Sequence, residues 1–105
     1  MNDSEFGTLA DAALQRIEAA LEHCSADLDF AMISDGVLEI EFADASKIIV
    51  NRHDAAGEMW VAARSGGFHY RWDGAAWHDT RGGGELMAAL SRLVSEQAGE
   101  SVALL

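Results

Sequence analysis

A strict two-residue alternation in residues 37–42 (VLEIEF) is the feature that most constrains the fold of this chain. Because successive side chains of a strand point to opposite faces of a sheet, the apolar residues at even positions share one face. Further strand-like runs follow at 46–53, 58–64, 68–72 and 76–78, separated by only three or four residues. Connections this short join neighbouring antiparallel strands, so the segment is predicted to be an antiparallel meander.

Amphipathic helices are predicted on both sides of this meander. Over residues 4–23, apolar residues recur at steps of four and three, and Asn2 with Glu5 resembles a helix-capping box. Residues 85–98 repeat the helical pattern, and Gly99 is expected to end it. We therefore predict an α+β fold, a two-layer sandwich in which two helices pack on one face of an antiparallel sheet of about five strands.

The same period divides the predicted sheet into an inner and an outer face. The inner face is expected to carry the core residues Leu38, Ile40, Phe42, Ile48, Val50, Met59, Val61, Phe68, Tyr70 and Trp72. The outer face, for which no helix is left, is expected to carry Glu39, Glu41, Lys47, Ile49, Asn51, His53, Trp60, Arg64, His69 and Arg71. An exposed tryptophan among arginine and histidine predicts a protein-docking patch, since aromatic and arginine residues are enriched at binding hot spots. The alternative is a single surface tryptophan that packs under its neighbours.

The charge of the chain restricts the class of partner. The 105 residues include 18 acids and 7 Lys or Arg, which gives a formal net charge of −11, and the length predicts a single domain over residues 1–105. Residues 1–50 hold 11 acids against Arg16 and Lys47, so −9 of the charge lies there. This charge argues against nucleic acid or an anionic membrane as partner and favours cations or a basic protein surface.

Several patterns bear on the cellular compartment. Cys24 is the only cysteine, so no internal disulfide is possible and a reducing compartment is favoured. The acidic opening residues do not fit a secretion signal, and no run approaches the ~20 apolar residues of a membrane span. We therefore expect a cytoplasmic protein in which Cys24 is an inert thiol on the buried side of the first helix.

A stripe of carboxylates is predicted on the first helix. At about 100° per residue, Asp11, Glu18 and Glu22 fall within about 40° of one another, on the side opposite the apolar residues. Carboxylate oxygens suit hard divalent ions, and an open row of them gives weak, hydrated sites. The alternative is a solvated helix face, which is the usual explanation of a run of charges.

No catalytic motif is present. The four histidines show no metal-protease or paired-cysteine spacing, although His53 and His69 are expected to approach across strands and His23 could assist a metal beside Glu22. The glycines at 82–84 are not followed by the Lys-Ser/Thr of a phosphate loop, and no nucleophile motif occurs. We therefore expect a protein that is not an enzyme.

At several segments together the chain resembles the frataxin family, specifically its bacterial CyaY branch. The residues that carry the resemblance are MNDSEF (1–6), SKIIVNR (46–52), Trp60-Val61-Ala62, Gly66-Gly67-Phe68-His69-Tyr70, Trp77 and Gln97-Ala98-Gly99-Glu100. They span nearly the whole chain, in the order that the family shows. The resemblance implies a role in iron–sulfur cluster assembly, with weak iron binding through carboxylates and docking on the cysteine desulfurase and the scaffold protein.

The resemblance also assigns residues to these two roles. It implies metal binding by Asp11, Glu18 and Glu22 on the first helix and by Asp27 and Asp29 in the loop that follows. It implies partner binding by Asn51, Trp60, His53 and His69, to which the predicted outer face adds Lys47, Ile49 and Arg71. Where close relatives carry acids, this chain has Ala19, His23 and Ser25. We therefore expect weak binding of iron (Fe²⁺ or Fe³⁺) and of other divalent cations.

The sequence thus predicts an iron-binding adaptor or regulator of iron–sulfur cluster assembly. We expect a monomer, which bound metal could induce to form oligomers. The main alternative is an acidic protein-interaction module with no metal role, and a third is an enzyme that oxidises iron on the acidic stripe, for which the sequence offers no defined redox site.

Overall fold

The computed structural model describes residues 1–104, which form two helices and one six-stranded sheet. In chain order the elements are α1 (Asp3–His23), β1 (Leu28–Ser34), β2 (Val37–Phe42), β3 (Lys47–His53), β4 (Glu58–Ala63), β5 (Gly66–Trp72), β6 (Trp77–Asp79) and α2 (Leu86–Ala98). The strands lie side by side in sequence order, and every neighbouring pair is antiparallel. The predicted meander is therefore confirmed.

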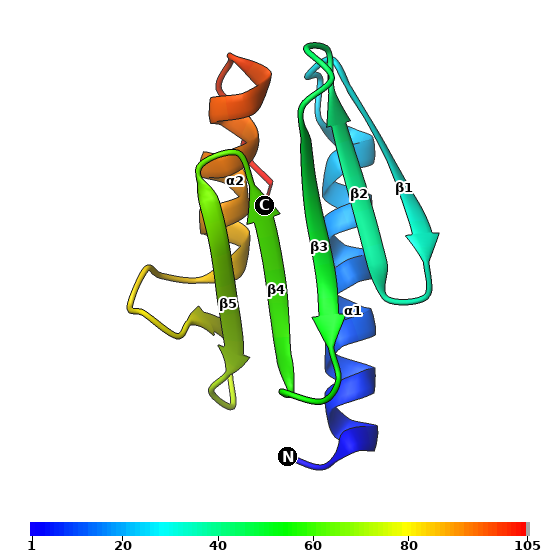
Figure 1. Cartoon of the computed structure of the whole chain (residues 1–105), viewed down its shortest axis with the longest axis vertical. Coiled ribbons are helices and arrows are strands. Elements are labelled where there is room, and N and C mark those ends of the chain that lie inside the picture. The colour runs from blue at the N-terminus through cyan, green and yellow to red at the C-terminus, as the bar shows by residue number, and fades with distance from the viewer. Residues whose placement is uncertain (105) are drawn as a thin grey trace.

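The two helices lie on the same side of the sheet, with α1 behind β2 and β3 and α2 behind β4 and β5 (Figure 1). This arrangement confirms the predicted two-layer sandwich. Eight of the ten predicted inner-face residues are at most 3% exposed, whereas Phe68 and Trp72 on β5 are only partly buried. Both helices cover this face with buried apolar residues. They are Phe6, Ala10, Leu14, Ile17 and Leu21 of α1 and Leu86, Met87, Ala89, Leu90, Leu93 and Val94 of α2. Neither helix of the described residues 1–104 is long and apolar enough to cross a membrane.

One strand was missing from the prediction. Residues 28–34, expected to be a loop, form β1, which pairs with β2 so that Leu28 lies opposite Phe42 and Asp29 opposite Glu41. Flanking aspartates and the weak strand propensity of alanine and serine hide this strand in the sequence. Pairing with the edge of β2 supplies the hydrogen bonds that the local sequence does not predict. Asp29 consequently lies in a strand.

The helix ends follow the predicted capping. The Asn2 side chain accepts a hydrogen bond from the Glu5 N–H at 2.8 Å and donates one to the Glu5 carboxylate at 3.0 Å. Gly99 ends α2 with φ 73°, a left-handed conformation that favours glycine. The start of α2 is capped by Glu85, whose carboxylate accepts from the Met87 N–H at 2.8 Å.

Gln97 of α2 ties the end of that helix to the sheet. Its side-chain oxygen accepts from the Arg64 N–H at 3.0 Å, and its amide nitrogen donates to the Ser46 hydroxyl at 3.0 Å and the Lys47 carbonyl at 3.2 Å. Because Gln97 is only 7% exposed, these groups have little access to water. Three hydrogen bonds from one buried amide therefore join α2 to the start of β3 and the end of β4.

We expect Gln97→Leu to lower the free energy of unfolding by about 2 kcal/mol, because an apolar side chain of similar size leaves buried backbone groups without partners. Urea denaturation measures the change, with Glu96→Ala on the exposed side of the same turn as the matched control. Equal stability of Gln97→Leu and the native protein would contradict this role for Gln97.

Candidate docking face and acidic ridge

Trp60 stands at the centre of a three-ring stack on the uncovered outer face of the sheet. The strand register places Trp60 opposite Asn51 of β3 and His69 of β5. The ring centroids of His53 and Trp60 are 3.7 Å apart with planes 14° from parallel, and those of Trp60 and His69 are 4.4 Å apart at 8°. Both faces of the indole are therefore covered by imidazole rings, and Trp60 is half-buried although no helix covers it.

Glu58 holds this stack from within the same face. Its carboxylate accepts the Trp60 indole N–H at 2.9 Å and the Arg71 guanidinium at 2.6 Å, and His69 Nδ1 lies 3.5 Å away. The residue is only 7% exposed. The hydrogen bond from Trp60 and then the bond from Arg71 hold the pKa of the Glu58 carboxyl below its usual range, so it is ionised at neutral pH.

Sequence reasoning did not select Glu58 as a site residue. The signal was available, because Glu58 precedes Trp60 by two positions in β4 and therefore shares its face. Burial of a carboxylate on an open sheet face could not be foreseen, since it arises from Arg71, thirteen residues further along the chain.

A shallow hollow lies beside the stack. It has a volume of about 170 Å³, and Ile49, Asn51, Ala62 and Gly67 line it together with Trp60. The register explains the hollow, because Ala62 of β4 lies opposite Gly67 of β5 and these two residues carry little or no side chain, while Ile49 of β3 forms the opposite wall. The hollow and the adjacent indole form an apolar depression on an otherwise polar face.

All seven predicted docking residues lie on strands β3, β4 and β5 with outward parity. Lys47 is exposed at the start of β3 and lies 3.6 Å from Glu39 of β2. Beyond it, Glu41 lies between Lys47 and Asp29 in the register. The outer face thus changes from aromatic and basic at β4 and β5 to acidic at β1 and β2.

On α1, Asp11 is already engaged by a residue of the sheet. Arg52 of β3 has inward parity, and its Nη1 lies 2.7 Å from the Asp11 carboxylate, while its Nε lies 2.8 Å from Asp54. Its hydrogen bonds to Asp54 and then to Asp11 raise the pKa of Arg52 above its already high value. A side chain on Gly36 would overlap Arg52, and φ at Gly36 is 75°, so glycine is required there.

The Asp11–Arg52 ion pair corrects the predicted position of the acidic stripe. Counted at 100° per residue, Asp11, Glu18 and Glu22 lie about 100° from the centre of the buried face of α1. The stripe therefore lies on the flank of α1, where Arg52 can reach Asp11, and not opposite the buried side. We use the name acidic ridge for five carboxylates on this flank and in the segment after it, of which only Glu18 is partly buried: Asp11, Glu18, Glu22, Asp27 and Asp29.

The ridge residues form a row and not a cage. Glu18 and Glu22 are one helical turn apart, but Asp11 lies about 10 Å before Glu18 along the axis. Asp27 is exposed between α1 and β1, and Asp29 points to the outer face of the sheet beside Glu41. Within residues 1–104, no three His, Cys, Asp or Glu side chains are close enough to hold one metal ion together.

The donor chemistry of the ridge fits a weakly held hydrated ion. Oxygen ligands suit Fe²⁺ and other hard divalent ions, and two glutamates one turn apart offer them to an ion that keeps most of its water. His23 Nδ1 lies 2.8 Å from the Ala19 carbonyl, so that nitrogen is occupied by the helix itself. Cys24 is partly buried against the core, as its predicted structural role requires.

The structure is that of a small α+β sandwich protein in which one sheet face is uncovered. That face carries a stacked tryptophan, and the first helix is acidic. A family model described as "Frataxin-like domain" matches residues 1–100. The chain belongs to the frataxin family.

Proteins called "Iron-sulfur cluster assembly protein CyaY" are similar over nearly the full length. That of Dechloromonas aromatica is 67% identical over 104 residues, covering 99% of both chains. That of Cupriavidus metallidurans is 52% identical over 107 residues, covering 99% of this chain and 96% of the relative. The solved structure of frataxin from Psychromonas ingrahamii aligns with a TM-score of 0.91 at 36% identity, covering 100% of this chain and 99% of that one.

Glu58→Gln is expected to lower the free energy of unfolding by about 1 kcal/mol at pH 7, because the amide keeps an acceptor for Trp60 but loses the ion pair with Arg71. A carboxyl whose pKa is lowered by folding contributes stability above its unfolded pKa and loses that contribution as pH falls. The difference between native protein and variant should therefore shrink from pH 7 to below pH ~4.

Urea denaturation at several pH values measures this difference, and Glu96→Gln on the exposed side of α2 is the matched control. A difference that stays constant over this range would show that Glu58 does not act through its charge.

Proposed function

We propose that this protein is a non-enzymatic, iron-binding adaptor or regulator of iron–sulfur cluster assembly. It docks on the complex of cysteine desulfurase and scaffold protein, and it binds ferrous iron weakly on the acidic ridge. Its relatives from Dechloromonas and Cupriavidus are named for iron–sulfur cluster assembly. The observation that carries the proposal is the outer face of the sheet, where Trp60 is held between His53 and His69 next to an apolar hollow.

The preorganised stack supports docking through this face. A tryptophan that is already fixed by two rings and a hydrogen bond loses little conformational freedom when a partner covers it. The hollow beside it can accept one apolar side chain of the partner, while Asn51 in its lining and Arg71 beside Glu58 offer polar contacts. An anchored aromatic residue with a polar rim is the arrangement of a binding hot spot.

The acidic ridge supports a second contact, with metal or with a basic protein surface. Like charges in a row repel one another, and a cation or a basic groove relieves that repulsion. Because Asp11 already pairs with Arg52, the partly exposed carboxylate of Glu18 and the exposed carboxylate of Glu22 are the proposed centre of metal binding. Iron on this open row is held weakly enough to be passed on.

The Asp11–Arg52 ion pair also favours the alternative function, an acidic interaction module without a metal role. In that case the ridge meets only a basic groove of the partner. Partner binding would then depend on the ridge charges but not on iron, and the metal titration described below separates the two functions.

Trp60→Ala is expected to weaken binding to the desulfurase–scaffold complex at least tenfold, which corresponds to a hot-spot loss of about 1.4 kcal/mol or more. Isothermal titration calorimetry with the purified complex measures the affinity. Arg92→Ala, an exposed position on the helical side of the molecule, is the matched control. Unchanged affinity of Trp60→Ala, in a variant whose amide spectrum shows a native fold, would contradict docking through this face.

Titration with Fe²⁺ or Co²⁺ is expected to perturb the amide signals of α1 around Glu18 and Glu22 first. Glu18→Gln with Glu22→Gln should weaken metal binding more than Asp11→Asn does, because Arg52 occupies the Asp11 carboxylate. NMR follows the titration, with Glu96→Gln as the control for a change of charge elsewhere. Absence of any perturbation between residues 11 and 29 would reject the metal role and leave the alternative function.

A further inference from the structure

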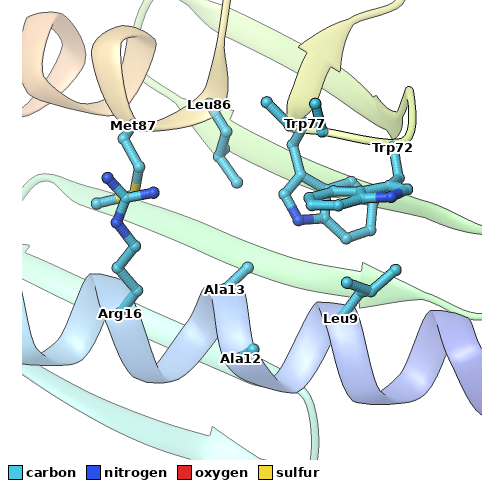
Figure 2. A pocket seen from close by; sticks show the side chains of 10 residues that line it. Leu9, Ala12, Ala13, Arg16, Trp72, Trp77, Leu86 and Met87 are labelled. Atoms are coloured by element: carbon cyan, nitrogen blue, oxygen red, sulfur yellow. The ribbon is translucent and has the colours of Figure 1, made fainter.

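A second depression lies on the helical side of the molecule, between α1, the start of α2 and the β5–β6 hairpin. Its volume is about 190 Å³, and most of its lining is apolar. Figure 2 shows Arg16 extending from α1 towards Met87 of α2, with the indoles of Trp72 and Trp77 above Leu9. Ala12, Ala13, Ala75, Ala76 and Leu86 complete its wall. We call this depression the helix groove.

The helix groove is open because its α1 wall carries mainly alanine. Ala12 and Ala13 lie on the flank of α1 that is turned away from the acidic ridge. Opposite them, Trp72 and Trp77 contact each other edge to face with centroids 5.6 Å apart, and Trp77 meets Phe6 at 5.9 Å. The aromatic wall is thus fixed by the core, while the alanine wall leaves space in front of it.

The only charged group that lines the helix groove is Arg16. Among residues 1–104, no acidic side chain forms an ion pair or hydrogen bond with it. The acids at that end of the molecule are engaged elsewhere: Asp73 accepts the Ala75 and Ala76 N–H groups at 2.8 and 2.9 Å, and Glu85 caps α2. In a chain of net charge −11, this guanidinium is a local positive site next to an apolar wall.

We propose that the helix groove binds a small carboxylic acid with one aromatic ring. The ring would lie against Trp72 and Trp77, and the carboxylate would pair with Arg16. The volume supports this ligand class, since a cavity of about 150 Å³ holds benzene and the groove is slightly larger. The proposal is independent of the proposed function, because the outer face of the sheet lies on the opposite side of the sheet from both helices.

The probe is 3-phenylpropionate, added to the ¹⁵N-labelled full-length protein at pH 7. We expect a Kd of about 1 mM, in keeping with a ligand of this size. The indole N–H signals of the three tryptophans provide an internal control. Those of Trp72 and Trp77 should shift, as should the backbone amide signals of Ala12 and Ala13, while that of Trp60 should not. The neutral 3-phenylpropanamide should bind at least fivefold more weakly because it cannot form the ion pair.

Two variants test the contacts separately. Arg16→Gln should reduce the affinity for 3-phenylpropionate to that for the amide, whereas Arg92→Gln, on α2 outside the groove, should leave it unchanged. Ala12→Leu should abolish binding of both compounds by filling the groove. Ala12 is exposed and leucine is a good helix former, so the fold is retained, and the amide spectrum checks this.

Three results would overturn the proposal. The first is the absence of shifts at Trp72 and Trp77 at 20-fold the expected Kd. The second is a result that excludes the ion pair with Arg16. Such a result is either equal affinity for 3-phenylpropionate and 3-phenylpropanamide, or an affinity for 3-phenylpropionate that Arg16→Gln does not change. The third is a shift at Trp60 of the same size, which would place the compound on the outer face or show unspecific binding to aromatic residues.

Discussion

Burial of one sheet face under two helices is the constraint on which the rest of the structure depends. The register aligns Leu38 with Val50, Val50 with Val61 and Val61 with Phe68, so one apolar row crosses four strands beneath the helices. Because neighbouring residues of a strand face opposite ways, the next row must face outward, and it contains Asn51, Trp60 and His69. A slip of one residue would exchange the two rows. The packing that fills the core therefore also assembles the proposed docking face.

Two charged side chains modify the surface of this framework. Each forms contacts with residues that the sequence gives no reason to pair with it. Glu58, buried beneath its neighbours, fixes the Trp60 indole and the Arg71 guanidinium on the outer face. Arg52 reaches from the inner side of β3 to α1 and pairs with Asp11, which joins the helix to the sheet and reduces the negative charge of the ridge. The structure thus fixes the side chains of the outer face and lowers the negative charge of the ridge, which supports the proposal of partner docking more than that of iron storage.

Much of the fold could be predicted because its signals are local. The alternation of VLEIEF, the short connections and the helical periodicity depend on neighbours within a few residues, and all of them are present in the structure. The strand β1 was missed because its formation depends on pairing with β2 and not on its own propensity. The outward direction of the proposed docking residues could also be predicted, because it follows from the two-residue period of each strand. The stacking of His53 and His69 on Trp60 joins three strands, so the sequence predicted only that the two histidines approach each other.

The sequence by itself determined the order of the elements other than β1, the inner and outer faces of β2 to β5, and the concentration of −9 charge in the first fifty residues. These features depend on residue type and local period. Only the tertiary structure decided which charges remain exposed. Arg52 and Asp11 are 41 residues apart and Glu58 and Arg71 are 13 apart, so no local pattern couples them. The strand register and the position of α1 on the sheet bring these pairs together, and the burial of Glu58 strengthens its hydrogen bond with Arg71.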